Sequence, residues 1–296
     1  MKKFNLKKLV AAATLTASVC TSGFVFAKEQ VSSVWKVTKG NDSLYVGGTI
    51  HILPISEFPL PEQFDRAYKD SDSIVLEAKL PAPSDMEAQQ AMLQAMTYAD
   101  GQNLKEIISE QTYNDLSKYL QGFGADLDQV AHFKPSFIVS MMVAMEAQRS
   151  SMAGSGVDAY FAQVAARDGK PQEYLETLEF QLDMLSNLGL GDEDQLIRSN
   201  LAYMPQLKEM LTSLIAAWRA GDVKQLEYFV VEKMKKESPA SFKTVMTDRN
   251  QDWVPKIEKM FGDEDKEFVL VGAGHLVGEK NVLTLLQQKG YKVERL

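Results

Sequence analysis

Cysteine is almost missing from this sequence. The 296 residues contain a single cysteine, Cys20, which lies in the amino-terminal segment. If that segment is removed during export, the rest of the chain has no thiol. Disulfide bonds and thiolate chemistry are then excluded, although an exported compartment would permit disulfides.

The chain also lacks an excess of positive charge and any late run of apolar residues. Its formal net charge is −8, and removal of four amino-terminal lysines would make it −12. Nucleic acid and anionic membrane surfaces are therefore excluded as expected partners. No segment after residue 27 approaches the roughly 20 apolar residues that a membrane span needs.

The amino terminus has the pattern of a secretory signal. An uncharged run covers residues 9–27 and ends in Val25-Phe26-Ala27, and it follows four lysines, Lys2, Lys3, Lys7 and Lys8. We predict cleavage after Ala27, which would make Lys28 the first residue of a periplasmic or secreted protein. An uncleaved anchor is less favoured because the run is rich in Ala, Thr and Ser. A lipoprotein attached at Cys20 is disfavoured because the preceding residues lack the expected Leu and small residue.

Histidine is scarce too, and two of the three histidines share one local context. His51 ends Gly48-Thr49-Ile50-His51 after an apolar, strand-like run. His275 ends Gly272-Ala273-Gly274-His275 after a similar run, and the match indicates a paired site.

Each of these histidines belongs to a predicted strand–helix–strand unit. The first unit has strands at 43–46 and 73–77 around a helix at 61–70, and the second has strands at 268–271 and 291–294 around a helix at 279–289. Short crossovers of this kind favour parallel strands, and both histidines would emerge at carboxyl ends of strands, where sites lie in open sheets. We predict an α/β (α+β) fold in which residues 28–296 form one domain around a central mixed sheet, so that His51 and His275 meet.

The middle of the chain, about residues 85–262, has a mostly helical pattern. Apolar residues from Leu207 to Trp218 follow one helix face, and Asp222 with Gln225 resembles a capping box. Nearly all methionines lie between Met86 and Met260. They are typical of core filling, with an adaptable groove for a flexible apolar substrate as the alternative.

Two carboxylates follow predicted strands in the same way. Glu77 ends the strand at 73–77, and Glu176 follows a short predicted strand at 172–175 that comes after a helix stopped by Gly169. Two imidazoles and one or two carboxylates at strand ends suit a divalent metal with an open position for water. Zinc, manganese and cobalt fit about equally, and metal-bound water would remove the need for a serine or cysteine nucleophile. The alternative is that each histidine packs its ring and bonds a backbone carbonyl.

His132 is expected to lie outside this site. It sits at a predicted helix end just before Pro135, where an imidazole typically caps carbonyl groups, and no glycine turn presents it.

The ordered set of motifs resembles the TraB/GumN family, which is related to the Tiki proteins. The resemblance runs from about residue 34 to residue 296 and is carried by five motifs: Gly47 to His51, Val75 to Glu77, Gly156 to Asp158 with Leu175 to Thr177 and Gln181, Asp248 to Asn250, and Val271 to Leu276. The family is regarded as a metalloprotease group whose Tiki members cleave a peptide in a metal-dependent way.

The resemblance also implies residue roles. It marks His51 and His275 as metal ligands and Glu77 as a ligand or general base. It implies that Arg249 pairs with Glu77, or holds a substrate carboxylate or an oxyanion. Glu176 is the alternative base, or a partner of a backbone amide or of Arg249.

Three alternative functions follow from these predictions. The first is a metal-dependent hydrolase, a peptidase acting on a peptide or protein substrate with Glu77 or Glu176 as base. The second is a non-catalytic haem- or metal-binding protein, which a distantly related haem-binding lipoprotein group suggests. The third is a regulatory protein that sequesters a peptide in the helical section. The absence of a His-Glu-x-x-His helix weighs against the first function.

Overall fold

The computed structural model describes residues 32–296 except residues 80, 82–83, 100 and 263. The predicted signal segment, its cleavage point and Cys20 lie outside the described residues. Among the residues that are described, no helix is both long and apolar enough to cross a membrane.

The core of the fold is a six-stranded mixed sheet with the order β4-β3-β5-β2-β1-β6. Strands β2, β5, β3 and β4 are parallel, whereas β1 pairs antiparallel with both β2 and β6. The strands are β1 Val34–Lys39, β2 Asp42–Thr49, β3 Ser73–Leu76, β4 Gln172–Tyr174, β5 Glu267–Gly272 and β6 Lys292–Arg295. The predicted α/β (α+β) class with a mixed sheet is confirmed.

The two strand–helix–strand units interleave. Strand β5 of the second unit lies between β2 and β3 of the first unit, and β6 lies beyond β1 at the sheet edge. Every residue of β5 is buried, as a central parallel strand covered on both faces requires. In the register of the sheet, Thr49 pairs with Gly272, so the carboxyl ends of β2 and β5 coincide.

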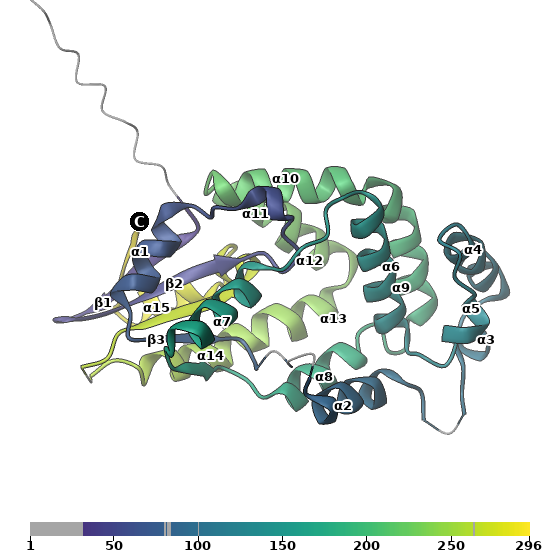
Figure 1. Ribbon diagram of the computed structural model, residues 1–296, viewed down its shortest axis with the longest axis horizontal. Coiled ribbons are helices and arrows are strands. Elements are labelled where there is room, and N and C mark those ends of the chain that lie inside the picture. The colour runs from purple at the N-terminus through teal and green to yellow at the C-terminus, as the bar shows by residue number, and fades with distance from the viewer. Residues whose placement is uncertain (1–31, 80, 82–83, 100, 263) are drawn as a thin grey trace, which may run out of the picture. The chain divides into compact units, whose positions relative to one another are not determined.

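Helices cover both faces of the sheet. One face packs against α1 Glu62–Asp70, α7 Val157–Asp168 and the buried Trp218 of α10 Leu207–Arg219. The other face packs against α14 Arg249–Glu258 and α15 Val282–Gln288. The sheet therefore forms the middle of three layers (Figure 1).

The section between β3 and β5 is largely helical, as predicted, and has its own apolar cluster around Leu116, Ile138 and Ile197. In Figure 1, α4 and α5 lie beyond α6 and α9, away from the sheet. Its helices, besides those named above, are α2 Met86–Met96, α3 Leu104–Ile107, α4 Glu110–Gln121, α5 Leu127–Val130, α6 Pro135–Arg149, α8 Leu178–Ser186, α9 Glu193–Tyr203, α11 Val223–Leu226, α12 Lys233–Glu237 and α13 Pro239–Phe242.

The chain also contains short 3₁₀ and π-helical turns between the longer elements. Two of them are π-helical, η3 Glu227–Glu232 and η4 Lys243–Asp248, and both line the pocket described below. The 3₁₀ turns are η1 Ile55–Glu57, η2 Met204–Gln206 and η5 Ala273–Leu276. The predicted cap before α11 forms as expected, since the Gln225 amide donates to Asp222 Oδ1 at 3.1 Å.

Candidate functional site

A pocket of about 620 Å³ opens at the carboxyl ends of the central parallel strands. His51 follows β2, Glu77 directly follows β3, and His275 lies in η5 directly after β5. All three line the pocket. The sheet order thus brings together groups that are far apart in the sequence.

The ring of His51 is held by Asp158 of α7. His51 Nδ1 lies 3.0 Å from Asp158 Oδ1, and the Val157 amide donates to the Ile50 carbonyl at 3.0 Å. This close approach of α7 needs a glycine, since a Cβ on Gly156 would lie 2.6 Å from the Cα and carbonyl oxygen of His51. Because a carboxylate only accepts, the Nδ1 position of His51 carries a proton.

The pKa of His51 is raised to about 9. Burial in the pocket lowers this pKa, but the hydrogen bond to Asp158 and the charges of Asp158 and Glu77 outweigh it. The side chain is still 61 % exposed, so solvent screens these charges in part. In the protein without a metal, His51 is therefore protonated at neutral pH.

His275 is buried and neutral. Its Nδ1 lies 2.6 Å from Asn250 Oδ1, and the Asn250 amide nitrogen donates to the Lys280 carbonyl at 2.8 Å, which fixes Oδ1 as the acceptor. The proton of the ring is then on Nδ1, and Nε2 presents a lone pair. Burial, followed by the charges of Arg249 and His51, lowers the pKa of His275 to about 3 against the opposing effect of Glu77.

Arg249 joins the two predicted carboxylates in one buried cluster. Its Nη2 donates to Glu77 Oε2 at 2.6 Å and to Glu176 Oε2 at 2.8 Å, and its Nε donates to Glu176 Oε1 at 2.8 Å. Its Nη1 lies 3.3 Å from His275 Nε2. The expected pairing with Glu77 is present, and all three guanidinium nitrogens already have partners.

Glu77 is ionised in this setting. Burial would raise its pKa, but the charge of His275, which is protonated only below about pH 3, the charges of Arg249 and His51, and the Gly272 amide lower it to about 2. The Gly272 amide donates to Glu77 Oε1 at 2.7 Å. Glu176, by contrast, is tied to the fold, since it also accepts from Trp253 Nε1 at 2.7 Å and its side chain is only 2 % exposed.

The two imidazoles and Glu77 converge above Gly272. A Cβ on this glycine would lie 3.4 Å from His51 Nε2, 3.3 Å from Glu77 Oε1 and 3.6 Å from His275 Cδ2. The donor chemistry fits a divalent metal, because each ring has a hydrogen-bond partner on Nδ1 and could present Nε2 to an ion. The described residues nevertheless contain no group of three or more His, Cys, Asp or Glu side chains already placed to hold a metal ion. A metal would have to displace the extra proton of His51 and compete with Arg249 for Glu77 and His275.

Comparison with known proteins gives the family. The sequence matches the TraB/PrgY/gumN family over residues 33–295. The chain belongs to this family. Its distant relatives include proteins named as metalloproteases, and no solved structure matches it.

Three relatives illustrate the range. Metalloprotease TIKI2 of Danio rerio is 23 % identical over 323 aligned positions, which cover 91 % of this chain and 62 % of the relative. Metalloprotease TIKI2 of Xenopus tropicalis is 22 % identical and covers 92 % and 61 %. The uncharacterized protein YbaP of Escherichia coli strain K12 is 26 % identical over 251 positions, covering 84 % of this chain and 89 % of YbaP. The chain thus spans less than two thirds of the TIKI relatives.

In this family member His51, Glu77, Arg249 and His275 line one pocket, and Glu176 is joined to it through its hydrogen bonds with Arg249. His132 lies apart from it and packs on Phe133 at a ring distance of 4.1 Å.

Sequence reasoning gave no role to Asp158, Asn250 and Trp253, which hold His51, His275 and Glu176. Asp158 and Asn250 stand inside the motifs that carry the family resemblance, which was the available signal. Nothing in the local sequence around Trp253 points to Glu176.

Proposed function

We propose that this protein is a metal-dependent hydrolase that cleaves peptide bonds. The observation that carries the proposal is the pair of hydrogen bonds that hold the two rings by Nδ1, between His51 and Asp158 and between His275 and Asn250, so that both rings lie beside Glu77 at Gly272 and keep Nε2 free of these partners. Metal-ligating histidines typically have such partners on the other ring nitrogen. The names of the TIKI relatives support the reaction class.

His51 and His275 would hold the ion, with Glu77 as a third ligand or as the group that orients water. A bound divalent ion supplies Lewis acidity and lowers the pKa of a coordinated water to near 7. The pKa of Glu77 is low in the protein without a metal, so its carboxylate is a weak base. This favours a role as an anionic ligand or as a hydrogen-bond acceptor over a role as the general base. Glu176 would position Arg249, and Arg249 would hold Glu77.

The test combines metal content with hydrolysis. The exported protein is purified, its zinc, manganese and cobalt are measured, and cleavage of a peptide library is followed with each metal supplied. We expect wild type to bind one metal and cleave peptides, and the variant with both His51→Ala and His275→Ala to do neither. His132→Ala is the matched control, because this third histidine lies outside the pocket and should leave both properties unchanged.

One observation favours a second function, a metal-binding protein without catalysis. Arg249 already holds Glu77 at 2.6 Å, so Glu77 is not free to act as a base on a water at an ion held by the two histidines. Stoichiometric metal binding without cleavage of any library peptide would select this function. A strong Soret band in the purified protein would indicate haem as the bound group.

A further inference from the structure

The lining of the pocket contains a polar group and an apolar group of residues that come from different elements. The polar side comes from the strand ends and α7, with His51, Glu77 and Asp158. The helical section contributes Gln181, Arg249 and a group of apolar residues, here called the apolar side. Its residues are Met184 and Leu185 of α8, Leu211 and Leu214 of α10, Val230 of η3 and Met246 of η4.

We propose that this apolar side is a specificity site for one large apolar side chain of the substrate, next to the bond that the polar side would act on. The proposal rests on the proposed function in taking a peptide as the substrate. A volume of about 620 Å³ is larger than a single side chain and leaves room for flanking backbone. Burying a Leu, Met or Phe side chain there removes apolar surface from water on both partners, which is the main source of such selectivity.

The charges of the pocket argue against a fatty acid as the occupant. Among the described lining residues Arg249 is the single Lys or Arg, and it is already paired with Glu77 and Glu176. Glu77 and Glu176 pair with this guanidinium, and a third carboxylate, that of Asp158, pairs with His51. In the metal-free protein, the state used in the test below, the side chains of the cluster sum to a negative charge even with His51 protonated and would repel a free carboxylate. A neutral peptide segment avoids this repulsion.

The side chains of the apolar side can adapt to apolar substrate side chains of different shapes. Met184 and Met246 are 8 % and 7 % exposed and bring unbranched, adaptable side chains to the pocket. Leu185 is 38 % exposed and marks the rim. Because Leu185 is at the rim, it can be replaced with little effect on the fold.

The test measures binding, so it does not depend on cleavage. Blocked heptapeptides that differ only in the central residue are titrated into the full exported chain in the presence of a chelator. We expect peptides with central Leu, Met or Phe to bind at least about tenfold more tightly than those with central Ser or Lys. Equal binding of the Leu and Ser peptides would overturn the proposal. So would tighter binding of decanoate than of the Leu peptide, with displacement of the peptide, since that points to an acyl chain.

Two leucine variants test whether the preference for apolar peptides arises at the apolar side of the pocket. Leu185→Glu should reduce the preference for Leu over Ser by at least about threefold, through loss of apolar contact and added negative charge. Leu190→Glu is the matched control, because Leu190 is 75 % exposed, lies close by in sequence and does not line the pocket. Equal losses in both variants would overturn the location. A clear binding preference without hydrolysis would support the specificity site while rejecting the hydrolase, and hydrolysis without preference would do the reverse.

Discussion

Arg249 and Glu176 meet through two parallel hydrogen bonds, Nε to Oε1 and Nη2 to Oε2, each 2.8 Å long. Both side chains are buried, with 5 % and 2 % exposure. This fork-to-fork geometry is the strong form of a charge pair, and it fixes the guanidinium that in turn holds Glu77. Glu176 therefore positions Arg249, and through Arg249 it positions Glu77.

Replacing Arg249 by Lys should destabilise the protein. Lysine keeps the charge but loses the planar fork, and an imperfectly paired buried carboxylate is costly. We expect Arg249→Lys to lower the free energy of unfolding by roughly 3 kcal/mol in urea titrations.

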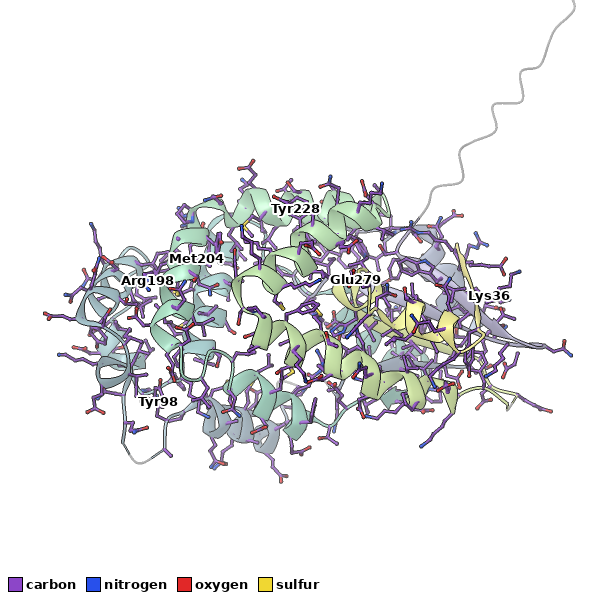
Figure 2. The ribbon with its side chains drawn as sticks, turned by 180° about the vertical axis from the view of Figure 1, so that it is seen from behind. Lys36, Tyr98, Arg198, Met204, Tyr228 and Glu279 are labelled. Atoms are coloured by element: carbon purple, nitrogen blue, oxygen red, sulfur yellow. The ribbon has the colours of Figure 1, made fainter. Side chains whose placement is uncertain are left out.

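The control is Arg198→Gln, because Arg198 is 63 % exposed and pairs with Asp194 at 3.6 Å. Figure 2 shows Arg198 among the helices, at the opposite end from Lys36 of the sheet. A change within about 0.5 kcal/mol is expected for the control, and an equal effect of both variants would contradict a buried pair.

The two pocket histidines should behave as one unit in metal binding. If both hold one ion, His51→Ala or His275→Ala alone should remove most of the bound metal, and the double variant should lose little more. Metal content after dialysis measures this. Additive, partial losses would instead show two separate roles.

Glu77→Gln should affect both activity and stability. The amide keeps the shape but removes the charge that faces Arg249, and it cannot act as a base. We expect hydrolysis to fall by about 10² or more and the free energy of unfolding to fall by about 1–3 kcal/mol, because Arg249 loses a charged partner. Single-turnover rates and urea titrations measure the two effects. Full activity in this variant would reject Glu77 as ligand and as base.

Stability should decline as the pH falls below about 6.5, and His275 is the reason. Its pKa is about 3 in the folded protein and near 6.5 in the unfolded chain, so between these values the unfolded state binds the extra proton. The free energy of unfolding should therefore decrease with a slope that approaches about 1.4 kcal/mol per pH unit. Glu77 adds a loss of the same sign below its unfolded value of 4.5, down to about 2.

The check is urea unfolding between pH 7 and 4.5, where Glu77 contributes little. The variant His275→Gln should lose most of the slope in this window. His51 acts in the opposite direction, since its raised pKa gives stability that is lost as the pH rises from 6.5 through about 9. This part should be small because the side chain is 61 % exposed. An unchanged slope in His275→Gln would contradict a buried, neutral His275.

Thr49 and Thr112 should respond to valine with opposite signs. Both are 2 % exposed, but the Thr49 hydroxyl has no hydrogen-bond partner among the described residues, whereas the Thr112 hydroxyl accepts from Ser109 at 3.0 Å. Removing a buried, unpaired hydroxyl removes a desolvation cost, so Thr49→Val should raise the free energy of unfolding by about 1 kcal/mol. Thr112→Val should lower it by a similar amount. Destabilisation by Thr49→Val would show that its hydroxyl has a partner in solution.

The sequence by itself determined the local features of this protein. Apolar periodicity and turn residues predicted β2, α1 and β3 and the helix at 207–219, because these signals depend on neighbours in the chain. The glycine motifs placed His51 and His275 at the ends of strands, and parallel pairing of those strands was enough to bring the histidines to one edge. Arg249 entered only through the family resemblance. Arg249 directly follows the π-helical turn η4. A π-helical turn departs from the spacing of an α-helix, so the sequence pattern does not predict which face of the helix Arg249 lies on.

The tertiary structure decided the rest. The position of β5 between β2 and β3, the approach of α7 that brings Asp158 to His51 across 107 positions, and the contact of Trp253 with Glu176 across 77 positions all depend on how distant surfaces pack. No local propensity encodes such contacts, because many pairings of the same elements satisfy the same local rules. The protonation of His51 and the neutrality of His275 also follow from packing, since one ring meets a carboxylate at an exposed edge and the other is buried beside a guanidinium.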